Sequence, residues 1–446
     1  MNQRESLASL AAVNVRRAVA ASVAASVAAS VAVLSLTACA TQEDAAEGDG
    51  TWVGTITAEG NVTTVVNEAG SVWGGTGRLV EEVSIGVDIG PLEYMLGGPG
   101  GLFATDSEIY VADPQVPTVR VYDWEGTYIR DFGRQGQGPG EYSRPGGVIV
   151  ADDGLVYVGD AGAMGRITVF SAEGESLDTW TFSVSDSMQI FGSQSVLRHD
   201  GAILVRASWY PPGEVRDRDA RKTGWQQVGP QGLIGEPLEE PDLGVERPAI
   251  PIGRGAIIVP YSPSQVSAFS PAGAYIVGNN SDYSFEIRHD DGRIVKVHRH
   301  WTPVPITEVE REYSKRSVAS SAHRSGAGSS WTYSGPDIPD HKPAYSVFSP
   351  TQDSRVMVSR YGASHLVEGC DLTFDLAERP TQTCFTFERF WDMFDLDGMY
   401  LGEIERPDVP ALYTPFLRGD TMWAMVEDDA GVMKVKRYRL VLPGQE

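Results

Sequence analysis

The chain has 446 residues, of which 41% are hydrophobic and 22% are charged, a composition that can build a folded core and is not typical of a disordered chain. Its net charge is −24 and its Lys and Arg residues are scattered, so the sequence offers no basic stripe for a nucleic-acid backbone. We therefore expect no nucleic-acid partner.

The first 50 residues have the pattern of an export and anchoring segment rather than of a domain. A positively charged start precedes an uncharged Ala/Ser/Val-rich run at 18–36, which closes on the sequence Leu-Thr-Ala-Cys. This sequence resembles the lipobox of bacterial lipoproteins and implies a signal peptide at 1–38, lipidation of Cys39 and a flexible tether at 39–50. Ala40 follows the cysteine, and in such lipoproteins this favours the outer membrane, facing either the periplasm or the exterior. A membrane-spanning helix is the alternative.

The chain beyond the tether repeats itself. Residues 109–113, Ile-Tyr-Val-Ala-Asp, recur 47 positions later as Val-Tyr-Val-Gly-Asp, and residues 119–123 recur 48 positions later. A weaker third copy begins at Asp200. Each copy alternates short β-rich runs with Asp-Gly or Glu-Gly turns, which favour hairpins. Four short strands per unit at this period indicate a β-propeller.

The later copies are interrupted, and the number of blades depends on how the interruptions are counted. Without them, the repeating span 79–442 holds five to six units, and we predict one six-bladed domain at 51–446. The alternating run 78–89 is expected to complete the last blade and so remove an open sheet edge. Residues 52–67 are expected to form a further hairpin outside the ring. The insertions are predicted near 210–254, 301–342 and 361–389.

The second insertion contains a predicted helix. Thr307 and Glu310 fit a capping box, in which each residue satisfies a backbone N–H of the first helical turn. The helix is expected at about 308–319. The Ser- and Gly-rich stretch 320–330 is expected to follow it as a mobile segment.

Two segments carry a resemblance to a known family. Segment 121–142 reads VYDWEGTYIRDFGRQGQGPGEY, and segment 391–404 reads WDMFDLDGMYLGEI. Both resemble bacterial six-bladed, NHL-type β-propeller lipoproteins, in which a Gly-rich linker ends in Gly-Pro-Gly-Glu and an aromatic residue. The likeness covers most of 52–442 and implies an all-β, six-bladed propeller with four-stranded antiparallel blades. It implies little about activity, because many members of this family have no established biochemical role.

Three motifs that resemble functional sites are more simply explained as turns. The Gly-rich segment 133–140 leads into a strand, whereas a phosphate-binding loop leads into a helix. The sequence Asp-Leu-Asp-Gly at 395–398 lacks the downstream Glu of an EF-hand calcium loop. Asp113 and Asp160 occupy equivalent repeat positions, which suggests turn or inter-blade hydrogen bonds, with calcium ligation near the axis as the alternative.

Histidine and cysteine residues offer few metal ligands. His298 and His300 share one face of a predicted strand and are the candidates for a metal site, with a solvated polar face as the simpler interpretation. Cys370 and Cys384 are expected to form a disulfide in an oxidising compartment, with two separate buried thiols as the alternative. We predict no cofactor, and calcium is the alternative.

The first insertion has the composition of a binding surface. Aromatic and cationic side chains gather there in an otherwise acidic chain, as they would around an anionic or carbohydrate-like ligand. A solvent-exposed loop is the alternative. The candidate ligand-binding residues are Trp209, Tyr210, Arg216, Arg218, Arg221 and Trp225.

Together these features favour a monomeric, lipid-anchored module of the cell envelope that binds a ligand or a protein and has no catalytic residues. Its site is expected at the channel mouth or on the inserted loops, because loops on a rigid ring commonly carry function. The first alternative is a metal-dependent propeller enzyme, lactonase- or esterase-like with calcium or amidating-lyase-like with zinc. It would need Glu, Asn, Asp or three His residues from different blades. The second alternative is a structural component of the envelope.

Overall fold

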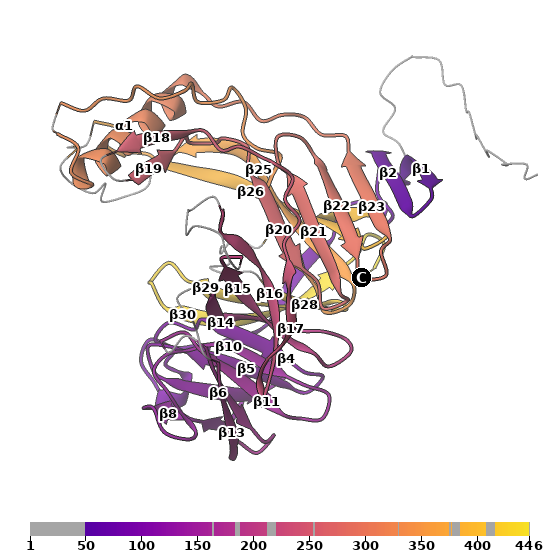
Figure 1. Cartoon of the computed structure of the whole chain (residues 1–446), viewed down its shortest axis with the longest axis vertical. Helices are drawn as coiled ribbons and strands as arrows, with labels where there is room; N and C mark the ends of the chain where they lie inside the picture. Colours follow the sequence, from indigo (N-terminus) through magenta and orange to yellow (C-terminus); the bar gives the residue numbers. More distant parts are fainter. Residues whose placement is uncertain are drawn as a thin grey trace, which may run out of the picture. The chain divides into compact units, whose positions relative to one another are not determined.

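The described part of the chain folds as six mainly antiparallel sheets with a small inserted subdomain (Figure 1). The architecture is known from a computed structural model. It describes residues 50–162, 165–182, 188–211, 220–252, 255–328, 330–373, 376, 384–406 and 415–445.

The first three sheets are blades of four strands each, joined by hairpins in chain order. Blade 1 comprises β4 (Gly101–Ala104), β5 (Glu108–Asp113), β6 (Thr118–Asp123) and β7 (Tyr128–Phe132). Blade 2 comprises β10 (Pro145–Val150), β11 (Val156–Asp160), β12 (Arg166–Phe170) and β13 (Ser176–Thr181). Blade 3 comprises β14 (Met188–Leu197), β15 (Ile203–Trp209), β16 (Lys222–Gly229) and β17 (Gly232–Glu239).

The remaining three sheets follow the same plan with additions. Blade 4 comprises β20 (Gln265–Phe269), β21 (Ala274–Asn279), β22 (Ser284–His289) and β23 (Ile294–Arg299). Blade 5 comprises β24 (Tyr345–Pro350), β25 (Arg355–Leu366), β26 (Phe385–Asp395) and β27 (Tyr400–Ile404). Blade 6 comprises β28 (Phe416–Arg418), β29 (Thr421–Glu427), β30 (Met433–Val441) and the upstream strand β3 (Arg78–Ile85).

Hydrophobic clusters fill all six junctions between neighbouring blades. Trp225 and Phe269 pack together at the junction of blades 3 and 4, and Ile109 and Trp423 belong to the cluster that joins blade 6 to blade 1. Middle strands such as β6 are therefore buried on both faces. The prediction of a six-bladed propeller with four-stranded antiparallel blades and one inserted helix is confirmed.

The ring closes with a strand from upstream, as the sequence predicted. β3 pairs antiparallel with β30, so blade 6 has its fourth strand and the edge of β30 is covered. The expected outer hairpin is also present, as β1 (Val53–Glu59) and β2 (Val62–Ala69). Its position is more specific than the sequence indicated, because β2 pairs in parallel with β23 and extends blade 4 to six strands.

The insertions differ in extent from the prediction. The span 210–254 contains β16 and β17, which are regular strands of blade 3, so this part of it is not an insertion. Polar residues within β16, such as the adjacent pair Gln226 and Gln227, interrupt the apolar pattern by which a strand is recognised in the sequence. Likewise, the span 361–389 includes the paired ends of the long strands β25 and β26.

The inserted subdomain combines the hairpin β18 (Ala249–Ile252) and β19 (Gly255–Ile258) with α1 (Glu308–Arg324). The helix starts where the capping motif predicted, since Thr307 Oγ1 accepts a hydrogen bond from the Glu310 N–H at 3.2 Å. It ends at Arg324 rather than near 319. The first residues of the stretch expected to be mobile are thus helical, and Ser320 and Ala322 are buried within α1.

Candidate functional site

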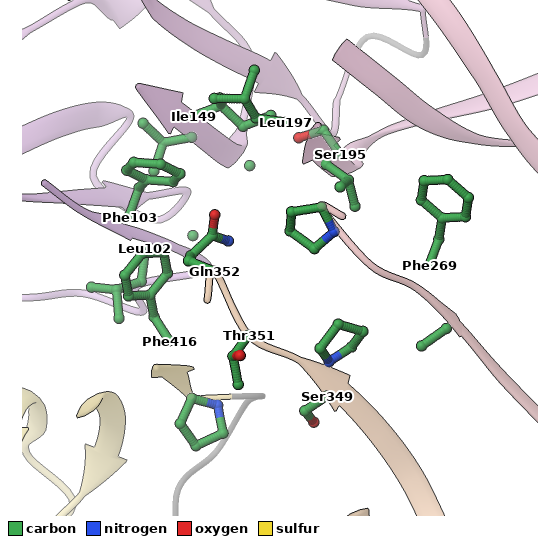
Figure 2. A pocket seen from close by; sticks show the side chains of 18 of the residues that line it. Leu102, Phe103, Ile149, Ser195, Leu197, Phe269, Ser349, Thr351, Gln352 and Phe416 are labelled. Atoms are coloured by element: carbon green, nitrogen blue, oxygen red, sulfur yellow. The ribbon is translucent and has the colours of Figure 1, made fainter. Parts of the chain in front are cut away.

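The innermost strands of the six blades surround a cavity of about 690 Å³. Every blade contributes to its wall, through β4, β10, β14, β20, β24 and β28. We call this cavity the axial channel (Figure 2). Its volume lies in the range of pockets that hold small ligands.

Most side chains of the channel wall are apolar, but polar atoms, including those of the backbone, make up about half of its exposed surface. Figure 2 shows Leu102, Phe103 and Ile149 from blades 1 and 2, with Phe416 from blade 6 and Phe269 from blade 4. The polar side chains between them are small or uncharged, and those of blade 5 are Ser349, Thr351 and Gln352. Such a wall favours apolar groups, with a few positions for a hydrogen bond.

One charged group lines the channel, and it is neutralised. The Arg206 guanidinium contacts Glu240 Oε2 at 2.5 Å and lies 5.7 Å from the centre of the Trp225 ring. Ser267 donates a short hydrogen bond to the other carboxylate oxygen. Burial raises the pKa of Glu240, but the hydrogen bond from Ser267 and the charge of Arg206 outweigh burial, so the pKa is lowered and the carboxylate stays ionised.

Trp225 also lines the channel and has an unsatisfied donor. Its side chain is buried, and Nε1 has no hydrogen-bond partner in the described structure. A buried donor without a partner is costly.

The side chains that line the channel do not fit the metal site of a calcium- or zinc-dependent propeller enzyme. Among the described residues of the wall, the side-chain oxygen atoms belong to Ser, Thr and Gln residues, with no carboxylate or imidazole. Calcium in proteins prefers carboxylates, and catalytic zinc sites use His, Asp, Glu or Cys. Within the described chain, no group of three or more His, Cys, Asp or Glu side chains is arranged to hold a metal ion.

The candidate ligand-binding residues of the first insertion lie on both faces of blade 3. Trp225 pairs with Arg206 and lines the channel, whereas Trp209 packs against the cluster shared with blade 2. Tyr210 follows β15 and is half-buried, and Arg221 donates a hydrogen bond to Ser208 Oγ at 3.1 Å. Arg216 and Arg218 lie outside the described residues.

The two histidines of the predicted metal candidate are on the exposed face of β23 or just beyond it. His298 and His300 are both exposed, whereas Val295 and Val297 of the same segment are buried. This alternation is the one expected of a strand with one solvated face.

Asp113 and Asp160 are fully buried and bind backbone N–H groups, as the turn interpretation predicted. Asp113 accepts hydrogen bonds from Gly97 and Gln115, and Asp160 accepts them from Ser143, Arg144 and Gly162. Each carboxylate therefore fixes the linker that precedes its own blade.

Blade 4 repeats this arrangement with an amide. Asn280 Oδ1 accepts from the Ser264 N–H at 2.7 Å, and Asn280 Nδ2 donates to the Tyr345 carbonyl at 2.8 Å. The repeats recognised in the sequence did not include this third copy. An Asn in place of the repeated Asp, directly after an apolar strand, was the signal that could have revealed it.

The remaining motifs form turns and one disulfide bond. Gly133 and Gly140 have positive φ values of 75° and 71°, as a blade-to-blade linker requires. Asp395 accepts hydrogen bonds from the N–H groups of Asp397 and Met399, which makes that segment a hairpin turn. The predicted disulfide between Cys370 and Cys384 is confirmed. Cys39 lies outside the described residues.

A buried polar cluster in the inserted subdomain was not predicted. Glu310 Oε1 accepts hydrogen bonds from Tyr261 at 2.8 Å and from Ser364 at 2.6 Å, and it lies 3.7 Å from Lys342 Nζ. Lys342 also donates to the Gly362 carbonyl at 2.8 Å. Burial lowers the pKa of Lys342, while the carboxylate of Glu310 opposes that effect. The sequence identified Glu310 only as part of a helix cap.

The comparisons with known proteins agree with this architecture. Residues 93–194, which span blades 1 and 2 and the start of blade 3, match the family model DUF5128, described as a 6-bladed beta-propeller. No curated protein matches the chain. No helix in the described ranges is long and apolar enough to cross a membrane.

Three solved structures are similar to the chain at low sequence identity. One is a member of the DUF4221 family from Bacteroides vulgatus, with 10% identity, coverage of 82% of this chain and 99% of that chain, and a TM-score of 0.46. A streptogramin B lyase has 12% identity, coverage of 81% and 98%, and a TM-score of 0.39. A calcium-binding protein, regucalcin, from Agrobacterium tumefaciens has 9% identity, coverage of 83% and 98%, and a TM-score of 0.35. From its six blades and the family match, the chain is a six-bladed β-propeller.

Proposed function

We propose that the chain is a non-catalytic binding module that takes a small, uncharged and largely apolar ligand into the axial channel. The observation that carries this proposal is the channel wall, to which all six blades contribute mainly apolar side chains. Transfer of apolar ligand surface from water to such a wall is favourable by about 25 cal/mol per Å².

The polar groups of the channel support an uncharged ligand. Arg206 already has Glu240 as its counter-ion, so a charged ligand would have to compete with that ion pair. The amide of Gln352 and the hydroxyl of Ser349 would orient the ligand, whereas the Thr351 hydroxyl is already bound to Asp353 and to the backbone of Arg355.

Titration with the neutral apolar dye N-phenyl-1-naphthylamine tests this proposal. The dye is expected to bind with saturable fluorescence, and Leu102→Trp, which fills the channel, is expected to weaken binding at least tenfold. The matched control is Leu177→Trp, because Leu177 is 54% exposed on β13 and lies outside the channel. Equal dye affinity in the two variants would overturn the assignment of the site.

We further propose that the module is exported and held at the outer membrane by a lipid on Cys39, because the N-terminal sequence resembles a lipobox. In a bacterial host labelled with radioactive palmitate, Cys39→Ser is expected to lose the label and leave the membrane fraction. Thr41→Ser, two positions later, is the control and is expected to retain both. Membrane association of Cys39→Ser that survives alkaline washing would contradict this anchor.

A further inference from the structure

A second cavity lies in the inserted subdomain, away from the axial channel. Its volume is about 580 Å³, and it is bounded by the end of β19 and the loop that follows it, by one face of α1 and by the first part of blade 5. Asn280 of blade 4 also lines it. None of its lining residues belongs to the channel wall. We call it the helix-side cavity.

The loop that forms one wall of this cavity has two costly features. Ser262 is only 6% exposed, and its hydroxyl has no hydrogen-bond partner in the described structure. The preceding residue, Tyr261, has a φ of 59°, which is uncommon for a residue with a side chain. Backbone strain and unsatisfied buried polar groups tend to persist where a ligand uses them.

The opposite wall offers further hydroxyl groups. Ser314, Ser317 and Ser321 all line the cavity from α1. Their spacing of three and four residues places them on one face of the helix. A hydroxyl can both donate and accept a hydrogen bond. Ser321 Oγ already accepts from Arg324 at 3.2 Å and can still donate, so this face can offer a ligand both donors and acceptors.

Three tyrosines supply rigid aromatic surface to the cavity. The Tyr261 hydroxyl is held by Glu310 Oε1, and the ring of Tyr313 packs on Phe385 with centres 5.3 Å apart. Tyr361 completes the set on β25. Aromatic side chains fixed in this way give contact area at little cost in conformational entropy.

From this combination we infer that the helix-side cavity binds a neutral saccharide. The C–H faces of a sugar ring pack on tyrosine rings, and its hydroxyls match the Ser hydroxyls on both walls. An anionic ligand fits less well, because Arg247 is the single charged residue among the described residues that line the cavity, and it lies exposed. This site is independent of the ligand proposed for the axial channel.

The test is a binding measurement on the full chain in detergent. Saturation-transfer NMR and calorimetry would use the neutral trisaccharides cellotriose, xylotriose, maltotriose and chitotriose, with trigalacturonate and inorganic phosphate as anionic probes. At least one neutral trisaccharide is expected to bind saturably. Ser317→Trp, which fills the cavity, is expected to abolish binding, and Ser262→Ala is expected to weaken it about threefold to tenfold.

Three controls decide the outcome. Ser325→Trp makes the same change at an exposed position just after α1 and outside the cavity, and it is expected to bind normally. Leu102→Trp in the axial channel is also expected to bind normally, so failure of one site is distinguished from failure of the other. Melting temperatures show that each variant is folded. The inference is overturned if no neutral trisaccharide binds, if Ser317→Trp binds normally while folded, or if only the anionic probes bind.

Discussion

At the residue scale, the ion pair between Glu310 and Lys342 is the most deeply buried charge pair of the inserted subdomain. The exposed fractions of the two side chains are 1% and 0%. Tyr261 and Ser364 complete the hydrogen bonding of one carboxylate oxygen, whereas Glu310 Oε2 has no partner in the described structure. The pair joins α1 to the segment that leads into blade 5, so its role is to fix the subdomain on the ring.

Breaking this pair from one side is expected to destabilise the subdomain strongly. Lys342→Met leaves the Glu310 carboxylate buried without a counter-ion, and such changes typically cost about 3–5 kcal/mol. The double variant Glu310→Gln/Lys342→Met is expected to cost much less than the sum of the single changes. Chemical denaturation of all three variants measures this coupling.

An exposed pair on the same helix provides the control. Glu312 and Lys315 approach to 2.7 Å, but their side chains are 61% and 33% exposed. Removal of either charge is therefore expected to cost less than about 1 kcal/mol. If Lys342→Met were as mild as Lys315→Met, the buried pair would not be what holds α1 in place.

At the element scale, the linkers between blades depend on glycine at defined positions. Gly133 ends the first blade with a φ of 75°, and an added Cβ would lie 1.7 Å from the Tyr142 hydroxyl. That hydroxyl cannot move freely, because Tyr142 is fully buried and donates to the Phe132 carbonyl at 2.5 Å. Only glycine at position 133 therefore leaves room for the Tyr142 side chain.

Gly133→Ala is accordingly expected to destabilise the protein by about 2–5 kcal/mol, from the positive φ and the collision together. Gly201→Ala is the matched variant, since its φ is 83° and no atom lies within 4 Å of the added Cβ. It carries the cost of the positive φ alone, about 1–2 kcal/mol. Thermal or denaturant unfolding of the two variants gives the difference, and equal losses would show that contact with Tyr142 is not limiting.

Elements with a local signal were predictable from the sequence. The Asp-Gly and Glu-Gly turns recur with the period of a blade, so the ring and its closing strand β3 could be predicted. The start of α1 was marked by Thr307. The hairpin of β16 and β17 lacked such a signal, because polar residues interrupt its apolar pattern and tertiary packing overrides the local preference.

The candidate sites were less predictable, because they arise from contacts between distant segments. The channel wall takes a few residues from each inner strand. Residues that line the same cavity, such as Leu102 and Phe269, are therefore far apart in the sequence. No local sequence signal distinguishes Ser262, because its place in a cavity depends on α1, which lies on the opposite wall. Glu310 carried a local helix signal, and its burial against Lys342 could not be inferred from that signal.

At the scale of the whole molecule, three partly buried carboxylates have lowered pKa values, so the stability of the ring depends on pH. For Glu108, the hydrogen bond from Arg130 is the main cause, and burial opposes it. For Glu240 and Asp353, burial raises the pKa, but hydrogen bonds and a neighbouring arginine outweigh it. Glu240 joins blade 3 to blade 4, and Asp353 accepts from Arg355 and from the Gly419 N–H of blade 6.

These shifts predict how stability depends on acid. Because the folded chain holds these carboxylates ionised below the pKa values of the unfolded chain, near 4.5 for Glu and 3.8 for Asp, the unfolded state binds more protons there. Their contribution is fully present above about pH 4.5 and is lost as the pH falls through the lower folded values. Glu403 and Asp395 act in the opposite direction, since burial raises their pKa values.

We therefore expect the free energy of unfolding to fall below pH 4.5, in guanidinium titrations at each pH. His289, whose pKa burial lowers, is expected to add a loss that begins below about pH 6.5. Glu240→Gln is expected to lower stability by about 1–2 kcal/mol at pH 7 and to reduce the slope below pH 4.5, because the variant has no proton to take up. Glu59→Gln, at an exposed turn, is expected to change neither quantity. If Glu240→Gln lost stability equally at every pH, the linkage between blades 3 and 4 would act through shape and hydrogen bonding rather than through ionisation of this carboxylate.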